Sequence, residues 1–560
     1  MKTDIELALE AKALPIKDLA ESLGIPEDDL SLYGNKKAKI SHRLLKKWES
    51  RPNGKMVLVT AMHPTPYGEG KTTVSVGLAD GLRKIGENAI LALREPSLGP
   101  VFGIKGGAAG GGRAQVIPME DINLHFTGDF HAITTANNLL SAMIDNHIHQ
   151  GNKLRIDLKR IVWQRCMDMN DRSLRNVVVG LGNPADGQVR EDHFDITAAS
   201  ELMAILCLSS DLEDLKKRLG EIVVGFNYDK EPVKVRDLQA EGAMTLILKE
   251  AMDPNLVQTM ENTPALVHGG PFANIAHGCN TIVATKLAMK LADYTITEAG
   301  FGSDLGAEKF FDIKCRMAGI RPDAVVIVAT IRALEHQGGR EVKKDYDLEE
   351  LLKFEQKGLP NLYRHIDNIQ DVYGLPVVVA INKFITDSRD EIDLLERALE
   401  KKGIKYALAE GWEKGGAGMT DLAKEVLDVC NKEDKKDFRF AYDLDKGLKD
   451  KAVELAKKIY HADNVEFSRE ALAAIKRLEK FGYGQLPICM AKTQYSFSDN
   501  EKLLNAPEHF DISIRQVKLS AGAGFVVMLT GAIMTMPGLP KVPAAVNMDI
   551  KEDGTILGLF

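Results

Sequence analysis

Short apolar runs recur along the chain, and each is followed by glycine, proline and polar residues. The clearest runs occupy residues 56–59, 89–93, 324–329 and 375–381. Runs of this length without polar alternation are typical of strands that are buried on both faces of a parallel sheet. Amphipathic helical patterns lie between such runs, for example at residues 390–403. The chain is therefore predicted to be an α/β protein with a doubly wound, mostly parallel sheet.

The polar stretch after the first run is the most informative one. It reads TAMHPTPYGEGKTTVSVGL at residues 60–78. A strand, a glycine loop, Gly-Lys-Thr and a helix together predict a phosphate cradle of the P-loop NTPase kind, in which Lys71 reaches the terminal phosphates and Thr72 helps to hold Mg²⁺. Thr65 stands where the usual pattern has its first glycine, and an ordinary turn between strand and helix is the alternative. The predicted ATP-binding residues are Thr65, Pro66, Tyr67, Gly68, Glu69, Gly70, Lys71, Thr72 and Thr73.

Charged residues also follow the second apolar run. Arg94 and Glu95 come directly after residues 89–93, where α/β sheets place their ligands. A guanidinium there suits a carboxylate or a phosphate, although a surface salt bridge is the alternative. Asp129 lies among polar residues that precede a helix expected from residue 136.

Several later loops carry further candidates. The glycine run that includes Gly106 and Gly107 is either a linker or a loop that closes over a ligand. His268 is either a ligand contact or a core histidine. Trp412 lies in a glycine-rich stretch, where it either packs or stacks on something flat. The remaining candidates in such loops are Gly269, Asn274, Phe301, Arg332 and Phe384.

Length and composition limit the kind of protein. A chain of 560 residues suggests three or four domains. Its formal net charge of −8, with both signs interspersed, argues against nucleic-acid binding. The six cysteines form no CxxC pair, which suits a reducing cytoplasm. With no signal peptide and no apolar run of membrane-spanning length, we expect a cytoplasmic protein without a membrane partner.

The patterning also suggests a division into domains. Residues 1–110 and 238–362 are predicted to form a discontinuous nucleotide-binding domain. Residues 111–237 are predicted to be an inserted α/β domain, and residues 363–560 a C-terminal α/β domain that contributes to the substrate site.

Several long and unusual motifs make the chain recognisable. They include PTPYGEGKTT, REPSLGP, GIKGGAAGGG, TGDFHAIT, HGGPFANIAHG and EAGFGSDLGAEKFFDIKCR. Over nearly all of its 560 residues the chain resembles formate–tetrahydrofolate ligases, also called formyltetrahydrofolate synthetases. It carries no dehydrogenase or cyclohydrolase module, so it is most similar to the monofunctional bacterial form.

The chain departs from the family pattern at five positions. Arg113 stands where relatives usually carry Tyr. Glu335 and Gln337 stand where relatives usually carry Lys and then His or Asn. Lys383 and Ile385 stand where relatives more often carry Arg and Pro.

The resemblance implies an ATP-dependent ligase that joins formate to tetrahydrofolate through formyl phosphate. The products are 10-formyltetrahydrofolate, ADP and phosphate. It implies catalytic roles for Lys71, Arg94, Glu95 and Asp129, and folate contacts from Phe384, Trp412, Glu95 and Asp129. It also implies Mg-ATP, activation by a monovalent cation such as K⁺ or NH₄⁺, and a homotetramer.

Two other functions remain open from the sequence. One is a P-loop ligase of the dethiobiotin synthetase type, which also activates a carboxyl group with ATP but has no need of an aromatic slot. The other is a nucleotide-dependent switch protein such as a metallochaperone or a partitioning ATPase. Such proteins often carry a metal-binding Cys pair or a lysine early in the glycine loop, and residues 65–69 contain no lysine.

Overall fold

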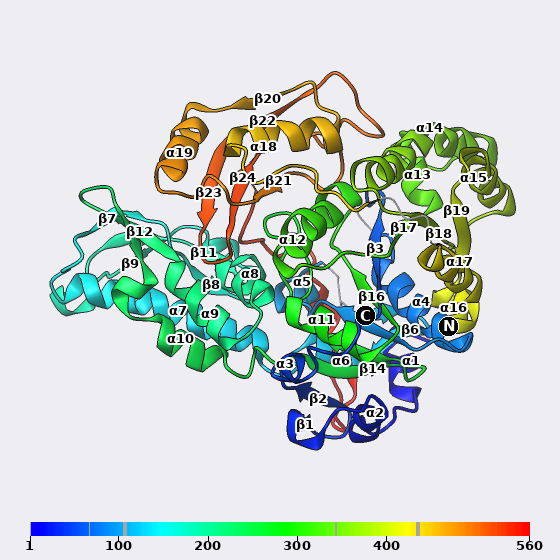
Figure 1. The fold of residues 1–560 in the computed structure, drawn as a ribbon, viewed down its shortest axis with the longest axis horizontal. Coiled ribbons are helices and arrows are strands. Elements are labelled where there is room, and N and C mark those ends of the chain that lie inside the picture. Colours follow the sequence, from blue (N-terminus) through cyan, green and yellow to red (C-terminus); the bar gives the residue numbers. More distant parts are fainter. Residues whose placement is uncertain are drawn as a thin grey trace.

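A sheet of 12 strands forms the centre of the protein (Figure 1). The structure is a computed structural model that describes residues 2–65, 68–104, 109–341, 344–432, 437–531 and 533–559. The strand order is β1-β2-β14-β15-β4-β16-β3-β17-β18-β19, with β6 paired to β14 and β5 paired to β6. The strands are β1 (Leu30–Tyr33), β2 (Lys37–Ile40), β3 (Lys55–Ala61), β4 (Ala89–Leu93), β5 (Gly110–Gly111), β6 (Ala114–Ile117), β14 (Asn255–Thr259), β15 (Pro264–Val267), β16 (Tyr294–Glu298), β17 (Ala324–Ala329), β18 (Val377–Asn382) and β19 (Lys405–Ala409).

All neighbouring strands from β15 to β19 are parallel, whereas β1, β2, β6 and β14 pair antiparallel. The prediction of an α/β protein with a mostly parallel sheet is confirmed. In this order β16 lies between β4 and β3. The carboxyl ends of parallel strands meet at one edge, so the loops after these three strands are neighbours.

Both faces of the parallel part are covered by helices. Val57 and Val59 belong to one hydrophobic cluster, whereas Met56 and Leu58 belong to another. Because side chains alternate along a strand, this division means that both faces are buried. The helices around the sheet are α4 (Lys71–Lys84) and α17 (Thr420–Asn431), whose side chains join the first cluster, and α11 (Ile282–Leu291), α13 (Ile331–Gln337), α14 (Leu348–Asp367) and α15 (Arg389–Lys402), whose side chains contribute to the other core clusters.

Two smaller α/β parts flank the sheet (Figure 1). One contains β7 (Ile156–Ile161), β8 (Arg165–Met167), β9 (Val177–Val179), β10 (Arg190–Asp192), β11 (Phe194–Ile196), β12 (Val223–Asn227), β13 (Pro232–Lys234), α7 (Asp129–His149), α8 (Glu201–Leu208), α9 (Leu212–Glu221) and α10 (Glu241–Leu248). The other contains α18 (Leu448–Leu455), α19 (Arg469–Lys480), β20 (Asn464–Phe467), β21 (Ile488–Ala491), β22 (Asp511–Ile514), β23 (Gln516–Ser520) and β24 (Phe525–Leu529). The remaining elements are α1 (Asp4–Glu10), α2 (Ile16–Ser22), α3 (Leu44–Lys47), α5 (Leu98–Gly103), α6 (Met119–Asn123), α12 (Arg316–Ala318), α16 (Gly411–Lys414), β25 (Asp549–Ile550) and β26 (Ile556–Leu557).

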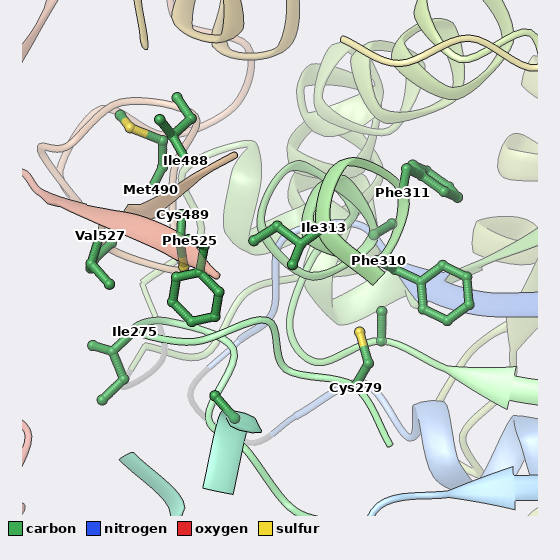
Figure 2. Close-up of a cluster of buried hydrophobic side chains, with 14 of the residues drawn as sticks. Ile275, Cys279, Phe310, Phe311, Ile313, Ile488, Cys489, Met490, Phe525 and Val527 are labelled. Carbon is green, nitrogen blue, oxygen red and sulfur yellow. The ribbon is translucent and has the colours of Figure 1, made fainter. Parts of the chain in front are cut away.

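The C-terminal part packs on the rest of the molecule through a continuous apolar core. Figure 2 shows Phe525 of β24 next to Ile313, with Ile488 and Met490 of β21 on the same side of Ile313. Ile313 belongs to a π-helical segment, Phe310–Cys315, and all four side chains belong to one hydrophobic cluster. This core therefore fixes the C-terminal sheet relative to the segment that follows β16.

Two strands of the central sheet, β18 and β19, come from residues 363–560, and β6 comes from residues 111–237. The proposed division into domains stays a prediction, although the sheet itself crosses those boundaries. Within the described ranges, none of the helices combines the length and the hydropathy that crossing a bilayer requires.

Candidate active site

The glycine loop, residues 65–73, connects β3 to α4. Gly68 and Gly70 have φ angles of 81° and 69°, which only glycine adopts without strain. Asn382, at the end of β18, donates a hydrogen bond of 3.0 Å to the carbonyl oxygen of Glu69. A Cβ on Gly70 would lie 2.5 Å from the Asn382 amide nitrogen. Asn382 therefore holds the loop against the sheet edge, through a hydrogen bond at Glu69 and close packing at Gly70. Pro66 and Tyr67 lie outside the described residues.

The Glu69 side chain points into the protein. Its carboxylate accepts a hydrogen bond of 2.6 Å from the Thr65 backbone N–H and another from the Thr330 hydroxyl. Burial raises the pKa of Glu69, and these hydrogen bonds oppose that shift. Glu69 thus braces the loop through its side chain and leaves the loop backbone to meet a ligand.

Lys71 is the first residue of α4. Its ammonium group interacts with two charged groups at the ends of strands, Glu298 of β16 and Arg94 after β4. Burial lowers the pKa of Lys71, the carboxylate of Glu298 opposes this, and the guanidinium of Arg94 lowers it further. Lys71 and Arg94 therefore share one electrostatic environment. Two neighbouring cations beside the carboxylate of Glu298, with a smaller opposing effect from Glu69, form a site for an anion.

Glu298 is the last residue of β16, and its side chain is 2% exposed. The Thr72 hydroxyl donates a hydrogen bond of 2.9 Å to it. A hydroxyl and a carboxylate are oxygen donors of the kind that Mg²⁺ prefers, so this pair fits the ion. Glu298 was not among the predicted site residues, because its strand reads YTITE and lacks the continuous apolar pattern of its neighbours.

Arg94 follows β4 directly. Its Nη1 donates a long hydrogen bond of 3.4 Å to the carbonyl oxygen of Pro271. Its Nε is buried and has no hydrogen-bond partner among the described residues. A Cβ on Gly300 would lie 3.0 Å from Nη1, so the guanidinium packs against the backbone that follows Glu298. Since a buried donor without a partner is costly, the guanidinium is available for a ligand.

Glu95 and Asp129 form a separate buried group with Lys39. Lys39 lies 2.8 Å from one carboxylate oxygen of Asp129, and Asn255 donates a hydrogen bond of 2.8 Å to the other. Burial raises the pKa of Glu95 well above its usual value, and the negative charge of Asp129 adds to this. Oε2 of Glu95 has no hydrogen-bond partner within the described part of the chain. Glu95 is thus the acidic residue of this group that stays open to a ligand.

Phe384 and Trp412 line a common cavity of about 620 Å³. The guanidinium of Arg332 lies 5.0 Å from the centre of the Phe384 ring and donates a hydrogen bond of 2.9 Å to the Thr386 hydroxyl. The same cavity is lined by Gly68, Gly70 and Thr73 of the glycine loop. The two aromatic residues are therefore brought next to the phosphate-binding element, whereas Glu95 and Asp129 are not among the residues that line this cavity.

Arg113 contacts the segment that carries Trp412 through its backbone. Its N–H donates a hydrogen bond of 2.9 Å to the carbonyl oxygen of Trp412. Gly112 has a φ of 59°, and a Cβ there would meet the Trp412 backbone and ring. The glycine run thus supports the segment that carries Trp412. Because residue 113 makes its contact through its backbone N–H, this contact does not depend on the unusual side chain. Gly106 and Gly107 lie outside the described residues.

Other candidates are used within the protein. His268 is fully buried, and its ring nitrogens bond the Thr281 hydroxyl and the carbonyl oxygen of Ala251, both at 2.7 Å. This geometry favours the core histidine over the ligand contact. Gly269 accepts a backbone hydrogen bond from Glu95, Asn274 is half-buried, and Phe301 adopts a φ of 58°. The unusual residues Glu335 and Gln337 are also buried, where Glu335 pairs with Arg340 and Gln337 accepts a hydrogen bond from the Asn505 backbone.

A glycine loop, two converging cations and an adjacent aromatic cavity define a nucleotide-binding α/β enzyme with room for a flat second substrate. The family model of formate–tetrahydrofolate ligase matches residues 2–560. The chain belongs to this family, and the resemblance of its motifs is confirmed. Its activity is the ligation of formate to tetrahydrofolate with the use of ATP.

The position of Glu298 leads to a direct test. Glu298→Gln keeps a hydrogen-bond acceptor for Thr72 but removes the negative charge beside Lys71. We expect the concentration of Mg²⁺ that half-saturates activity to rise roughly 10- to 100-fold at fixed ATP. Glu201→Gln, which alters a distant carboxylate that accepts backbone hydrogen bonds from Gly522, serves as the control. An unchanged Mg²⁺ requirement in Glu298→Gln would contradict this role.

Proposed function

We propose that this chain forms 10-formyltetrahydrofolate in two chemical steps through formyl phosphate. In the first step an oxygen of formate attacks the γ-phosphorus of ATP, and the bond to ADP breaks. In the second step N10 of tetrahydrofolate attacks the formyl carbon, the carbon–oxygen bond to phosphate breaks, inorganic phosphate leaves, and the proton of N10 is released. The proposal rests on one observation: the segment that follows β16, between β4 and β3, meets the glycine loop through Glu298 and Thr72 and meets Arg94 through Gly300.

For the first step, the backbone of the glycine loop and Lys71 bind the ATP phosphates. The buried fork of Arg94 holds the formate carboxylate and directs one oxygen towards phosphorus, because a guanidinium matches a carboxylate in two hydrogen bonds. Thr72 and Glu298 would hold the Mg²⁺ that accompanies ATP, and the ion would neutralise phosphate charge. Formate needs this activation, since its oxygen leaves readily only as phosphate.

For the second step, Phe384 and Trp412 stack on the pterin ring in the cavity beside the glycine loop. Glu95, whose Oε2 is open, contacts the reacting end of the folate. Asp129 is paired with Lys39 and acts on Glu95 through its charge, which helps to keep that carboxyl protonated. A protonated carboxyl donates a hydrogen bond, which suits a carbonyl oxygen that gains negative charge.

Family membership supports four further proposals. The fold is a P-loop NTPase-like, doubly wound sheet with an inserted domain and a C-terminal domain. The enzyme is a homotetramer, a monovalent cation activates it, and it works in the cytoplasm.

The role of Arg94 is tested by steady-state kinetics. Arg94→Ala should lower kcat/KM for formate roughly 100-fold or more, because the fork that binds and orients formate is lost. The KM for ATP should change little. ADP formation is measured with ATP, formate and tetrahydrofolate, omitting each in turn. Equal losses for formate and ATP would show that Arg94 only supports the structure.

The aromatic pair is tested with Trp412→Ala. We expect the KM for tetrahydrofolate to rise about 10-fold, as the loss of one stacking face predicts, and the KM for ATP to stay the same. Because Trp412 also borders the glycine loop, a rise in the KM for ATP alone would mean that the ring holds the nucleotide instead.

A further inference from the structure

A fully buried charged cluster lies behind the glycine loop. It consists of His63, Asp304 and Lys492, each at most 1% exposed. One oxygen of the Asp304 carboxylate lies 3.1 Å from Nε2 of His63, and the other lies 2.7 Å from the Lys492 ammonium. Burial by itself would raise the pKa of Asp304, but Lys492 and His63 hold it below its usual range. Asp304 is therefore a buried carboxylate with a nitrogen of His63 or Lys492 close to each oxygen.

The hydrogen bonds define the state of His63. The Asn361 amide nitrogen lies 2.8 Å from Nδ1 of His63, which therefore accepts this hydrogen bond. Nε2 then carries the ring proton and faces Asp304. Lys492 also lies 5.0 Å from the centre of the Tyr460 ring and donates to the carbonyl oxygen of Ser496. Polar contacts thus link His63, Asp304 and Lys492 to one another and to groups around them.

The same region meets the spatial requirements of a metal site, because ligand atoms of His63, Asp304 and His365 lie within 4.8 Å of one another. The Lys492 ammonium already supplies a positive charge at this carboxylate. A second cation beside it would be strongly repelled in a buried environment. The geometry therefore favours an ion pair over a metal centre.

The cluster joins two segments that form the active site. His63 lies between β3 and the glycine loop. Asp304 ends the short segment 298–304, which begins with Glu298 beside Thr72 and continues through Gly300 against Arg94. Glu298 lies beside Thr72, at the predicted site of the ATP phosphates. Gly300 packs on Arg94, the predicted formate-binding residue.

Segment 298–304 is held in a strained conformation. Phe301 has a φ of 58°, which is unfavourable for a bulky residue. A Cβ on Gly302 would lie 2.8 Å from Oδ1 of Asp304 and 3.5 Å from the His63 ring, so the turn is packed tightly around the ion pair. Strain of this kind persists only where surrounding contacts fix the backbone.

Lys492 brings the C-terminal part into this arrangement. It directly follows β21, which pairs with β24 and belongs to the same core as Ile313 (Figure 2). The apolar core therefore holds Lys492 at a fixed place relative to the segment that follows β16.

We propose that Asp304 and Lys492 are positioning residues for formate activation: their buried ion pair holds segment 298–304 so that Gly300 and Glu298 keep Arg94 and the nucleotide phosphates in register. The inference rests on the proposed function, because it assigns formate to Arg94. It gives the C-terminal part a role in the first chemical step, in addition to its contribution to the core.

The test removes the charge of Lys492 in the full-length enzyme. Lys492→Met keeps most of the side-chain volume, and kcat/KM for formate should fall about 10- to 100-fold, as a small displacement of an orienting group predicts. The KM for tetrahydrofolate should not change. Lys492→Arg, which keeps the charge, should recover part of the activity. Asp304→Asn, which keeps the shape of the side chain, should show the same selective loss and provides a second variant if Lys492→Met does not fold.

Lys451→Met is the matched control. Lys451 is also a fully buried lysine of the C-terminal part, but it binds the carbonyl oxygens of Gly484 and Leu486. This variant should lower the midpoint of thermal unfolding without a selective effect on formate. If Lys492→Met behaves in the same way, the positioning role is wrong. Stoichiometric metal in the purified wild-type enzyme that is lost in His365→Ala would also overturn the ion-pair interpretation.

Arg94→Ala is measured alongside to separate the two claims. If Arg94→Ala impairs formate use and Lys492→Met does not, only the positioning role falls. If neither variant impairs formate use, the assignment of formate to Arg94 falls as well.

Discussion

Two cations that lie near each other at one edge of a parallel sheet are the constraint on which this active site depends. Lys71 and Arg94 repel each other, and burial increases that cost. The carboxylate of Glu298, on the strand between β3 and β4, and that of Glu69, within the glycine loop, oppose this effect at Lys71. The repulsion between the two cations is therefore lowest when the anionic phosphate and formate are bound. The positive charge thus already lies where the reaction develops negative charge.

The rest of the structure keeps this arrangement in place. Asn382 and Glu69 hold the glycine loop from the side of β18 and from within. Segment 298–304 carries the contacts to both substrate groups and ends in the buried pair of Asp304 and Lys492. The cavity of Phe384 and Trp412 opens beside the same loop, which places a flat substrate near the transferred group. Contacts from the glycine loop, the segment after β16, the loops after β18 and β19 and the C-terminal part thus converge on one sheet edge.

Local patterns predicted much of this structure. The strands at residues 89–93 and 324–329 agree with β4 and β17 at both ends, because fully apolar runs between glycine and polar residues leave little choice of boundary. The glycine loop and the helix that follows it, α4, were also recognisable, because all residues of this motif lie close together in the sequence. The helix expected from residue 136 begins earlier, at Asp129, because Gly128 with a φ of 91° precedes its first turn.

Long-range contacts were the part that the sequence could not reveal. Nothing near Glu298 indicates that it meets Thr72, and nothing near Asp304 indicates that Lys492 will neutralise it. The inward side chain of Glu69 and the satisfied ring of His268 are likewise decided by partners elsewhere in the chain. Pattern analysis identifies which loops carry chemistry, whereas the fold decides which of their side chains face the substrate.

The most direct measurement of the central claim follows an oxygen atom. The enzyme is supplied with ATP, tetrahydrofolate and formate labelled with ¹⁸O, and the inorganic phosphate is analysed by mass spectrometry. If Lys71 and Arg94 bring formate to the γ-phosphorus, each phosphate released carries one ¹⁸O from formate. Phosphate without the label would show that formate never bonded to phosphorus, and this account of the active site would be wrong.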